Sequence, residues 1–165
     1  MNYVISLDIG TTGCKCMLFD AYGNIVGNTY LEYPLIVHSD KEIEQNAELW
    51  WNLSLEAISS TIKSAKIDGK KIIGICVTSQ GISFVPIDKN INVLDNAISW
   101  LDRRAEEEIL HIMDYCSQDV LFRMTGKRPS AVYMLPKLMW LKTKKPDIYE
   151  KTYKFLMAHD FVVAR

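Results

Sequence analysis

Two glycines and two threonines follow a short apolar run near the start of the chain, in Asp8-Ile9-Gly10-Thr11-Thr12-Gly13-Cys14-Lys15. Glycines let a backbone come close to a ligand. Turn N–H groups, the hydroxyls of Thr11 and Thr12 and the charge of Lys15 all suit phosphate oxygens. Asp8 can orient a Mg²⁺ through water, because Mg²⁺ keeps much of its hydration shell. The alternative is a plain hairpin turn, and the Walker pattern Gly-x-x-x-x-Gly-Lys-Ser/Thr is absent.

Two further polar clusters have the chemistry to bind hydroxyl groups. In Ser79-Gln80-Gly81-Ile82-Ser83, the Gln80 amide can donate to and accept from hydroxyls; the alternative is a polar turn. In Trp100-Leu101-Asp102-Arg103-Arg104, the indole can cover the C–H face of a sugar, while Asp102 accepts from hydroxyls and an arginine donates to them. The alternative makes Asp102 the N-cap of the next helix and leaves the arginines exposed.

The elements that must position these clusters follow from hydropathy and turn residues. Strands at 3–8, 15–19 and 25–33, with turn residues between them, predict an antiparallel meander. The β-branched run at 72–78 lacks alternation, which predicts a strand buried on both faces. Further short strands are predicted at 82–87, 97–100 and 155–158.

Helical patterns occupy much of the remaining chain. Asn46 is expected to cap a helix, with Glu48 in its first turn. The predicted buried stripe of that helix consists of Trp51, Leu55, Ile58, Ile62 and Ala65. Later helices are predicted at 102–116, from a cap at Ser117 to Gly126, and at 136–142. Asp160 is the expected cap of a last helix.

Composition limits the class of protein. The chain has 165 residues, 48% hydrophobic and 24% charged, which is typical of one soluble globular domain with a sizeable core. A net charge of −1 gives no electrostatic reason to expect nucleic acid or a membrane as partner. The four cysteines and three histidines lack metal-ligand spacing. We therefore expect no metal site built on them, and free thiols in a reducing cytoplasm.

Taken in order, these segments resemble the N-terminal domain of the FGGY carbohydrate kinases. The segment 8–12 resembles the phosphate motif of that family, and 96–104 resembles its Trp-x-Asp-x-Arg motif. The segments 125–126, 135–141 and 154–161 resemble later parts of the same domain. The resemblance spans almost the whole chain.

The resemblance implies an α/β, ribonuclease H-like (actin-like ATPase) fold. Its mixed sheet would hold an antiparallel three-stranded meander, followed by helices and parallel strands. It further implies ATP- and Mg²⁺-dependent phosphorylation of a sugar or polyol hydroxyl by a cytoplasmic, xylulokinase-like enzyme. Residues 1–165 would form its N-terminal sugar- and phosphate-binding domain. The catalytic-base aspartate and most of the adenosine pocket would lie beyond Arg165, so the chain alone is expected to be inactive. A homodimer is compatible with this picture.

By position, the resemblance implies roles for individual residues. The residues implied to face the nucleotide phosphates are Thr11, Thr12, Gly13 and Lys15, with Asp8 near the metal. Those implied to line the sugar pocket are Gln80, Trp100, Asp102 and Arg104. An aromatic contact is expected near Tyr133 or Val132.

Two departures from the family pattern bear on the substrate. Gly81-Ile82 stand where glycerol kinases have an Arg-Glu pair, and Ile82 stands where xylulose kinases have a histidine. The loss of the Arg-Glu pair argues most firmly against glycerol. Two other functions stay open at this point, an actin-like ATPase or chaperone domain and a non-catalytic sugar-binding module. The cluster at 100–104 favours the kinase over the ATPase.

Overall fold

A computed structural model describes residues 1–165. The chain divides into two compact units, and each contains more than one segment of the sequence. Unit 1 consists of 1–35, 46–81 and 156–165, and unit 2 of 36–45 and 82–155. Neither unit has a helix long and apolar enough to cross a membrane.

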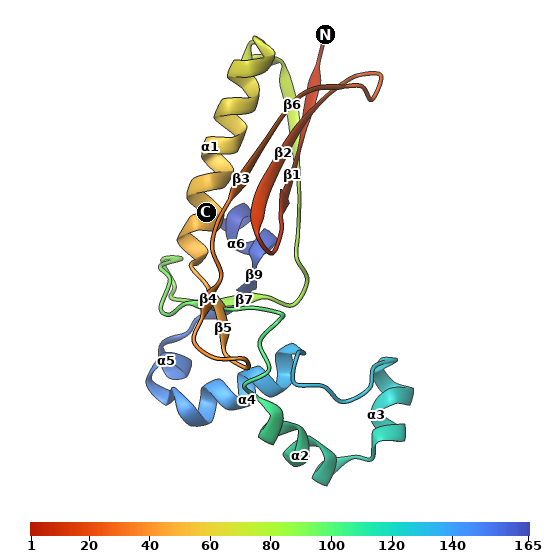
Figure 1. The fold of residues 1–165 in the computed structure, drawn as a ribbon, viewed down its shortest axis with the longest axis vertical. Helices are drawn as coiled ribbons and strands as arrows, with labels where there is room; N and C mark the ends of the chain where they lie inside the picture. Colours follow the sequence, from red (N-terminus) through yellow and green to blue (C-terminus); the bar gives the residue numbers. More distant parts are fainter. The chain divides into compact units, whose positions relative to one another are not determined.

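Unit 1 is built on a four-stranded mixed sheet (Figure 1). Its strands are β1 (Tyr3–Ile9), β2 (Gly13–Asp20), β3 (Ile25–Glu32) and β6 (Ile72–Ser79), in the order β3-β2-β1-β6. The first three pair antiparallel, which confirms the predicted meander. Strand β6 pairs parallel to β1.

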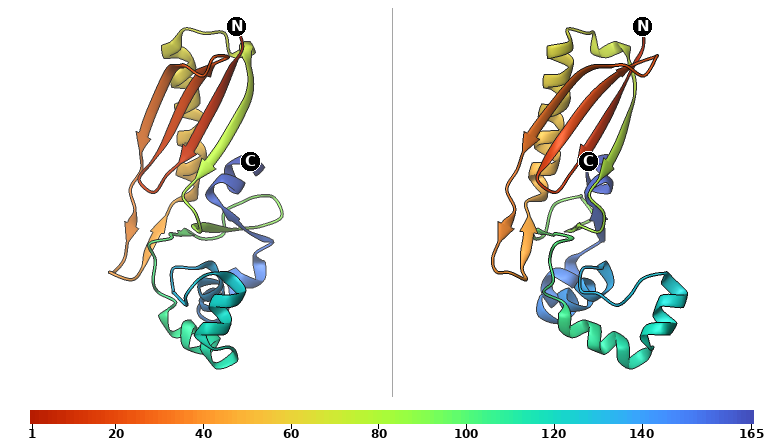
Figure 2. Two further views of the ribbon diagram at one scale, coloured as in Figure 1. Left: turned by 90° about the vertical axis from the view of Figure 1, so that its right-hand side faces the viewer. Right: turned by 45° about the vertical axis from the view of Figure 1, so that its right-hand side comes forward.

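Helix α1 (Ala47–Ala65) runs along one face of this sheet, as both views in Figure 2 show. Asn46 is its N-cap, as predicted, and accepts a hydrogen bond from the backbone N–H of Glu48. The predicted stripe is rotated from the one observed, which consists of Ala47, Trp50, Ser54, Ala57 and Thr61. Small residues of α1 face the sheet because the backbone of the helix lies close to the backbone of the strands. A Cβ added at Gly27 would lie 3.1 Å from the Cβ of Ala65.

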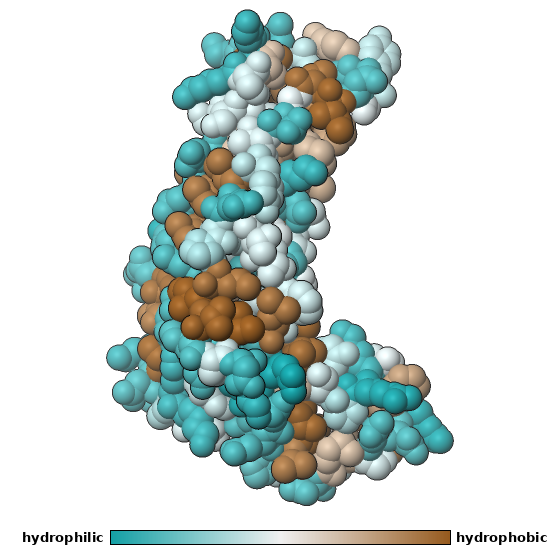
Figure 3. Space-filling model, in the orientation of Figure 1, coloured by the Kyte–Doolittle hydropathy of each residue, from teal (hydrophilic) through white to brown (hydrophobic).

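Strand β6 exists where predicted, but it is not buried on both faces. It is the last strand of its sheet, and its side chains Ile73 and Ile75 are exposed. Apolar areas interrupt the mostly hydrophilic face of the molecule that Figure 3 shows. The β-branched composition predicted the strand, whereas its position at an edge decided its burial.

Unit 1 also contains the short 3-10 helix η1 (Gly69–Lys71) and, at the end of the chain, helix α6 (Ala158–Ala164). The N-cap of α6 is Met157, so Asp160 is not the predicted cap. Instead, Asp160 lies in the first turn and accepts from the backbone N–H of Met157. Phe161 of α6 packs edge-on against Trp50 of α1, with ring centroids 6.4 Å apart.

Unit 2 combines short strands with four helices. Its sheet has the order β4-β5-β8-β7-β9. The strands are β4 (Ile36–Val37), β5 (Ile43–Gln45), β7 (Phe84–Ile87), β8 (Ala97–Ile98) and β9 (Lys154–Met157), the last of which ends in unit 1. The helices are α2 (Glu106–Tyr115), α3 (Gln118–Thr125), α4 (Met134–Lys144) and α5 (Pro146–Lys151). Ser117 and Gly126 cap α3 as predicted.

The core of unit 2 gathers side chains from strands and helices. Phe84 of β7, Ile98 of β8 and Leu141 of α4 are buried together. Phe155 of β9 meets Phe84 edge-on, with ring centroids 5.7 Å apart. This packing places α4 against the strands, and α4 carries two of the side chains that contact the polar cluster described below.

Candidate functional site

The predicted phosphate turn is a tight connection between β1 and β2 in unit 1. The Gly10 N–H donates to the Gly13 carbonyl at 2.9 Å. Tyr33 holds the turn from outside, because its hydroxyl donates to the Gly10 carbonyl at 2.5 Å and its backbone N–H donates to the Thr12 carbonyl at 3.1 Å. Burial raises the pKa of Tyr33, and the charges of Cys14 and Asp8 add to this, so the hydroxyl keeps its proton. The turn is therefore a fixed backbone structure.

Position 13 has no room for a side chain, so glycine is required there. A Cβ at this position would lie 2.6 Å from the Tyr30 ring and 2.7 Å from the Leu31 carbonyl oxygen, and real Cβ contacts are essentially never that short. The Tyr30 hydroxyl also lies 3.3 Å from the Thr12 hydroxyl. Thr12 is exposed and Thr11 half-buried, so both lie where a bound anion can reach the turn.

Asp8 and Lys15 lie directly opposite each other in the β1–β2 ladder. Thr78 of β6 pairs with Asp8 on its other side. Directly paired residues share one face of a sheet. Lys15 and Thr78 are exposed and Asp8 is half-buried. A carboxylate, an ammonium group and a hydroxyl thus form a row just below the turn. One carboxylate fits a hydrated Mg²⁺, which usually takes one or two carboxylates together with phosphate oxygens.

Gln80 follows β6 and lies beside the end of β1. Its backbone N–H donates to the Ile9 carbonyl at 2.9 Å. The neighbouring Ser79 hydroxyl donates to the Gln80 carbonyl at 3.0 Å and lies 2.8 Å from Nδ1 of His159. Unit 1 therefore brings Gln80 next to the phosphate turn. No sequence signal linked His159 to this site, because the contact joins residues eighty positions apart.

Trp100 lies in unit 2 on a turn after β8. The residue is 39% exposed, so part of it is accessible to a ligand. Its backbone N–H donates to the Ser83 hydroxyl at 2.9 Å. The turn closes where the Asp102 N–H donates to the Ser99 carbonyl at 3.1 Å. The exposed ring thus sits on a well-anchored backbone.

Asp102 is placed differently from the expected sugar contact. Its exposed fraction is 0%. One carboxylate oxygen accepts from the Ile43 N–H at 2.7 Å and from Nε of Arg104 at 2.9 Å, and the other accepts from the Arg104 N–H at 3.0 Å. All three donors are in the protein, so Asp102 organises this loop from inside. The alternative as helix N-cap is also wrong, because Ala105 is the N-cap of α2.

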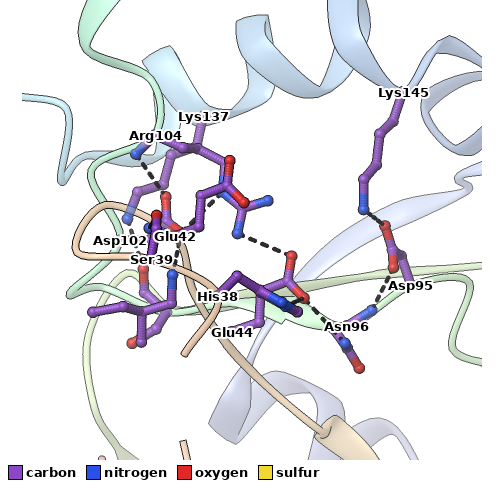
Figure 4. Close-up of polar contacts among 12 residues, drawn as sticks. His38, Ser39, Glu42, Glu44, Asp95, Asn96, Asp102, Arg104, Lys137 and Lys145 are labelled. Atoms are coloured by element: carbon purple, nitrogen blue, oxygen red, sulfur yellow. Dashed lines mark hydrogen bonds and ion pairs between the residues drawn. The ribbon is translucent and has the colours of Figure 1, made fainter. Parts of the chain in front are cut away.

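Arg104 is likewise buried, with 3% of its side chain exposed. Its guanidinium donates to Glu44 at 2.9 Å and to Asp102 (Figure 4). It also lies 4.8 Å from the ring centroid of Trp140. Because the guanidinium forms two ion pairs and stacks on an aromatic ring, few of its N–H groups remain to bind a ligand. The expectation that Arg104 lines the sugar pocket therefore also differs from its placement, and it is Arg103 that is exposed.

Glu44 of β5 completes the cluster and was not singled out from the sequence. Burial alone would raise the pKa of Glu44, but hydrogen bonds from Asn96 and His38 and the charge of Arg104 outweigh burial and lower it. The carboxylate therefore stays charged opposite the guanidinium. Sequence inspection could not find it, because Glu44 and Arg104 are sixty residues apart.

Ile82 begins unit 2 with an unusual backbone. Its φ is 55°, a region that a β-branched residue rarely adopts. Its side chain helps to line a cavity of about 260 Å³, together with apolar groups from α2, α3 and the start of α4, among them Ile109, Leu121 and Tyr133. Ile82, which the resemblance places at one position of the polar pair of the glycerol kinases, thus contributes an apolar surface.

Comparison with known proteins identifies the family of the chain. The model for the FGGY family of carbohydrate kinases, N-terminal domain, matches residues 3–165, so the chain belongs to that family. A xylulose kinase from Bacillus subtilis (strain 168) is 33% identical over 98% of this chain and 32% of its own length. A glycerol kinase from Thermococcus gammatolerans is 34% identical over 93% of this chain and 31% of its own length.

Solved structures give the same result for the fold. The chain superimposes on gluconate kinase from Lactobacillus acidophilus with a TM-score of 0.89 and 28% identity, over 98% of this chain and 32% of that one. It superimposes on a xylulose kinase from the same organism with a TM-score of 0.84 and 28% identity, over 99% of this chain and 33% of that one. The predicted α/β fold class is confirmed. The chain spans about one third of the length of these relatives.

Proposed function

We propose that the whole protein transfers the γ-phosphoryl group of ATP to a hydroxyl of a sugar or polyol. The observation that carries this proposal is that one chain of the FGGY family holds both a braced Gly-Thr-Thr-Gly turn, in unit 1, and an exposed indole on an anchored turn, in unit 2. The xylulose, glycerol and gluconate kinases among its relatives support this reaction class.

Phosphoryl transfer asks mainly for positioning and charge neutralisation. The acceptor oxygen attacks the γ-phosphorus and forms a new O–P bond. The bond to the β–γ bridging oxygen breaks, and ADP leaves. Thr11, Thr12 and the Gly13 backbone would hold phosphate oxygens, with Lys15 adding positive charge. Asp8 would hold a hydrated Mg²⁺, which when bound neutralises phosphate charge. We assign the base that accepts the hydroxyl proton to no residue of this chain.

On the acceptor side, Trp100 would cover the C–H face of the sugar, and Gln80 would exchange hydrogen bonds with its hydroxyls. Asp102 and Arg104 would act behind Trp100, because both are buried and paired. The side chain of Ile82 offers no hydrogen bond to a hydroxyl, which argues against glycerol. The xylulose and gluconate kinases among the relatives favour a ketose or aldonate of five or six carbons, which we propose as the acceptor.

The test uses the whole protein with ATP, Mg²⁺ and a panel of ketoses, polyols and aldonates. ADP release and the mass of the product report the reaction. We expect a phosphorylated product from at least one five- or six-carbon acceptor, with kcat/KM about tenfold or more above that for glycerol. Trp100→Ala should raise KM for that acceptor, while the matched Trp51→Ala on α1 should leave KM unchanged. Hydrolysis of ATP that no acceptor stimulates, with no sugar phosphate formed, would refute the kinase and favour an ATPase.

A further inference from the structure

Lys137 in the first half of α4 is an exception among the lysines. Its exposed fraction is 0%, and it is one of the largest fully buried side chains in the chain. Lysines are almost never fully buried unless a partner compensates the charge. Proline at the preceding position and the core contacts of α4 fix the helix that carries it. The buried ammonium group therefore needs a reason in its surroundings.

The partner of Lys137 is the turn that carries Trp100. Its Nζ donates to the Ser99 carbonyl at 2.7 Å. The same carbonyl accepts the Asp102 N–H that closes the turn. Trp100 and Leu101 lie between Ser99 and Asp102. The backbone N–H of Trp100 donates to the Ser83 hydroxyl. Lys137 thus adds a third attachment, from a different element, to the backbone on which the indole sits.

The charges around Lys137 balance only when it is protonated. Asp102 and Arg104 face its ammonium group, and Glu44 pairs with Arg104 on the far side (Figure 4). Two carboxylates and one guanidinium leave one negative charge, which Lys137 neutralises. Burial lowers the pKa of Lys137 to about 8, which Asp102 opposes and Arg104 assists. The side chain is therefore mostly charged at neutral pH and loses its proton at mildly alkaline pH.

We propose that Lys137 is a positioning residue for the acceptor site, fixing the Ser99–Asp102 turn and so holding the Trp100 indole in its ligand-binding orientation. It touches neither the acceptor nor the phosphates. The proposal rests on the proposed function only in taking Trp100 as the acceptor contact. Lys137→Met is the informative substitution, because methionine is close to lysine in length and keeps the apolar stem while removing the donor and the charge.

A first experiment reads the orientation of Trp100 without any substrate. Protein labelled with 5-fluorotryptophan gives one ¹⁹F NMR signal for each tryptophan, four of which lie in residues 1–165, and Trp100→Phe assigns the relevant one. Lys137→Met is expected to shift and broaden the Trp100 signal, while Trp50 and Trp51 on α1 serve as internal references. Lys144→Met, at an exposed position of the same helix, is the matched control and should change nothing.

The wild-type protein supplies a second reading that needs no core variant. Its Trp100 signal is expected to move with pH around a midpoint of about 8, the value at which Lys137 loses its proton. Lys137→Met should abolish that titration. A titration of the Trp100 signal that survives Lys137→Met, or a Trp100 signal that Lys137→Met leaves unshifted at pH 7, overturns the proposal.

Kinetics of the whole protein then connect the position to the reaction. Lys137→Met is expected to lower Tm, because it leaves one negative charge around Asp102 without its counterion. Below the Tm of the variant, we expect KM for the acceptor to rise about tenfold and kcat to change by less than about twofold. Unchanged KM with a displaced Trp100 signal would overturn the role in the acceptor site. If wild-type protein phosphorylates no acceptor while Trp100 still responds to Lys137, the proposed function fails and the positioning of Trp100 by Lys137 stands.

Discussion

The buried position of Asp102 leads to a prediction that separates a structural role from a ligand contact. Asp102→Ala removes the acceptor for the Ile43 N–H and for two donors of Arg104. Removing one partner of a buried ion pair costs about 3–5 kcal/mol. The orphaned Ile43 amide by itself costs about 1–3 kcal/mol. Since these costs overlap, we expect the free energy of unfolding to fall by roughly 3–5 kcal/mol.

Urea denaturation followed by tryptophan fluorescence measures this loss, since Trp100 and Trp140 report on unit 2. Arg103→Ala is the matched control. Its side chain is exposed and pairs with Glu106 at the surface, so it should cost no more than about 1 kcal/mol. Asp102→Asn keeps one carbonyl oxygen but no charge and should fall between the two.

Calorimetry on the folded fraction of each variant measures acceptor affinity, and this measurement can refute the structural role of Asp102. If Asp102→Ala unfolds within about 0.5 kcal/mol of wild type but binds the acceptor far more weakly, the carboxylate contacts the ligand and its assignment to the loop interior is wrong. If stability falls and Asp102→Asn retains most of the affinity, the reasoning from burial holds.

Three further predictions concern other parts of the site. Gly13→Ala places a Cβ against the Leu31 carbonyl and should cost about 1–3 kcal/mol, with weaker ATP binding by calorimetry; a normal affinity would show that the turn can adjust. Trp100→Ala should keep Tm within about 3 °C of wild type while acceptor affinity falls, and equal affinity would remove Trp100 from the site. Burial raises the pKa of Glu44, but its polar partners outweigh burial and hold the pKa below the usual 4.5. The carboxylate therefore stabilises the fold above pH 4.5, and this contribution is lost as the pH falls through the folded-state pKa. Glu44→Gln should therefore flatten the acid limb of a plot of unfolding free energy against pH, and an unchanged limb would contradict that assignment.

Much of the local structure followed from the sequence alone. Asn46, Ser117 and Gly126 cap helices where their residue types predicted, and the three-stranded meander has the predicted order. The glycine–threonine turn falls between β1 and β2 as expected. These features depend on hydrogen bonds and backbone preferences among residues close in the chain, which a sequence displays directly.

Burial was decided by tertiary structure. The same Trp-x-Asp-x-Arg segment leaves Trp100 exposed and buries Asp102 and Arg104, because Ile43, Glu44 and Trp140 come from distant segments to surround the last two. The attachment of Tyr33 to the phosphate turn and the rotated buried face of α1 have the same origin. The sequence by itself determined the phosphate turn, the meander, three of the helix caps and the family resemblance, although it misplaced the cap of α6. Only the packing of remote elements determined which polar side chains remain free to meet a ligand, since exposure depends on neighbours that no local pattern names.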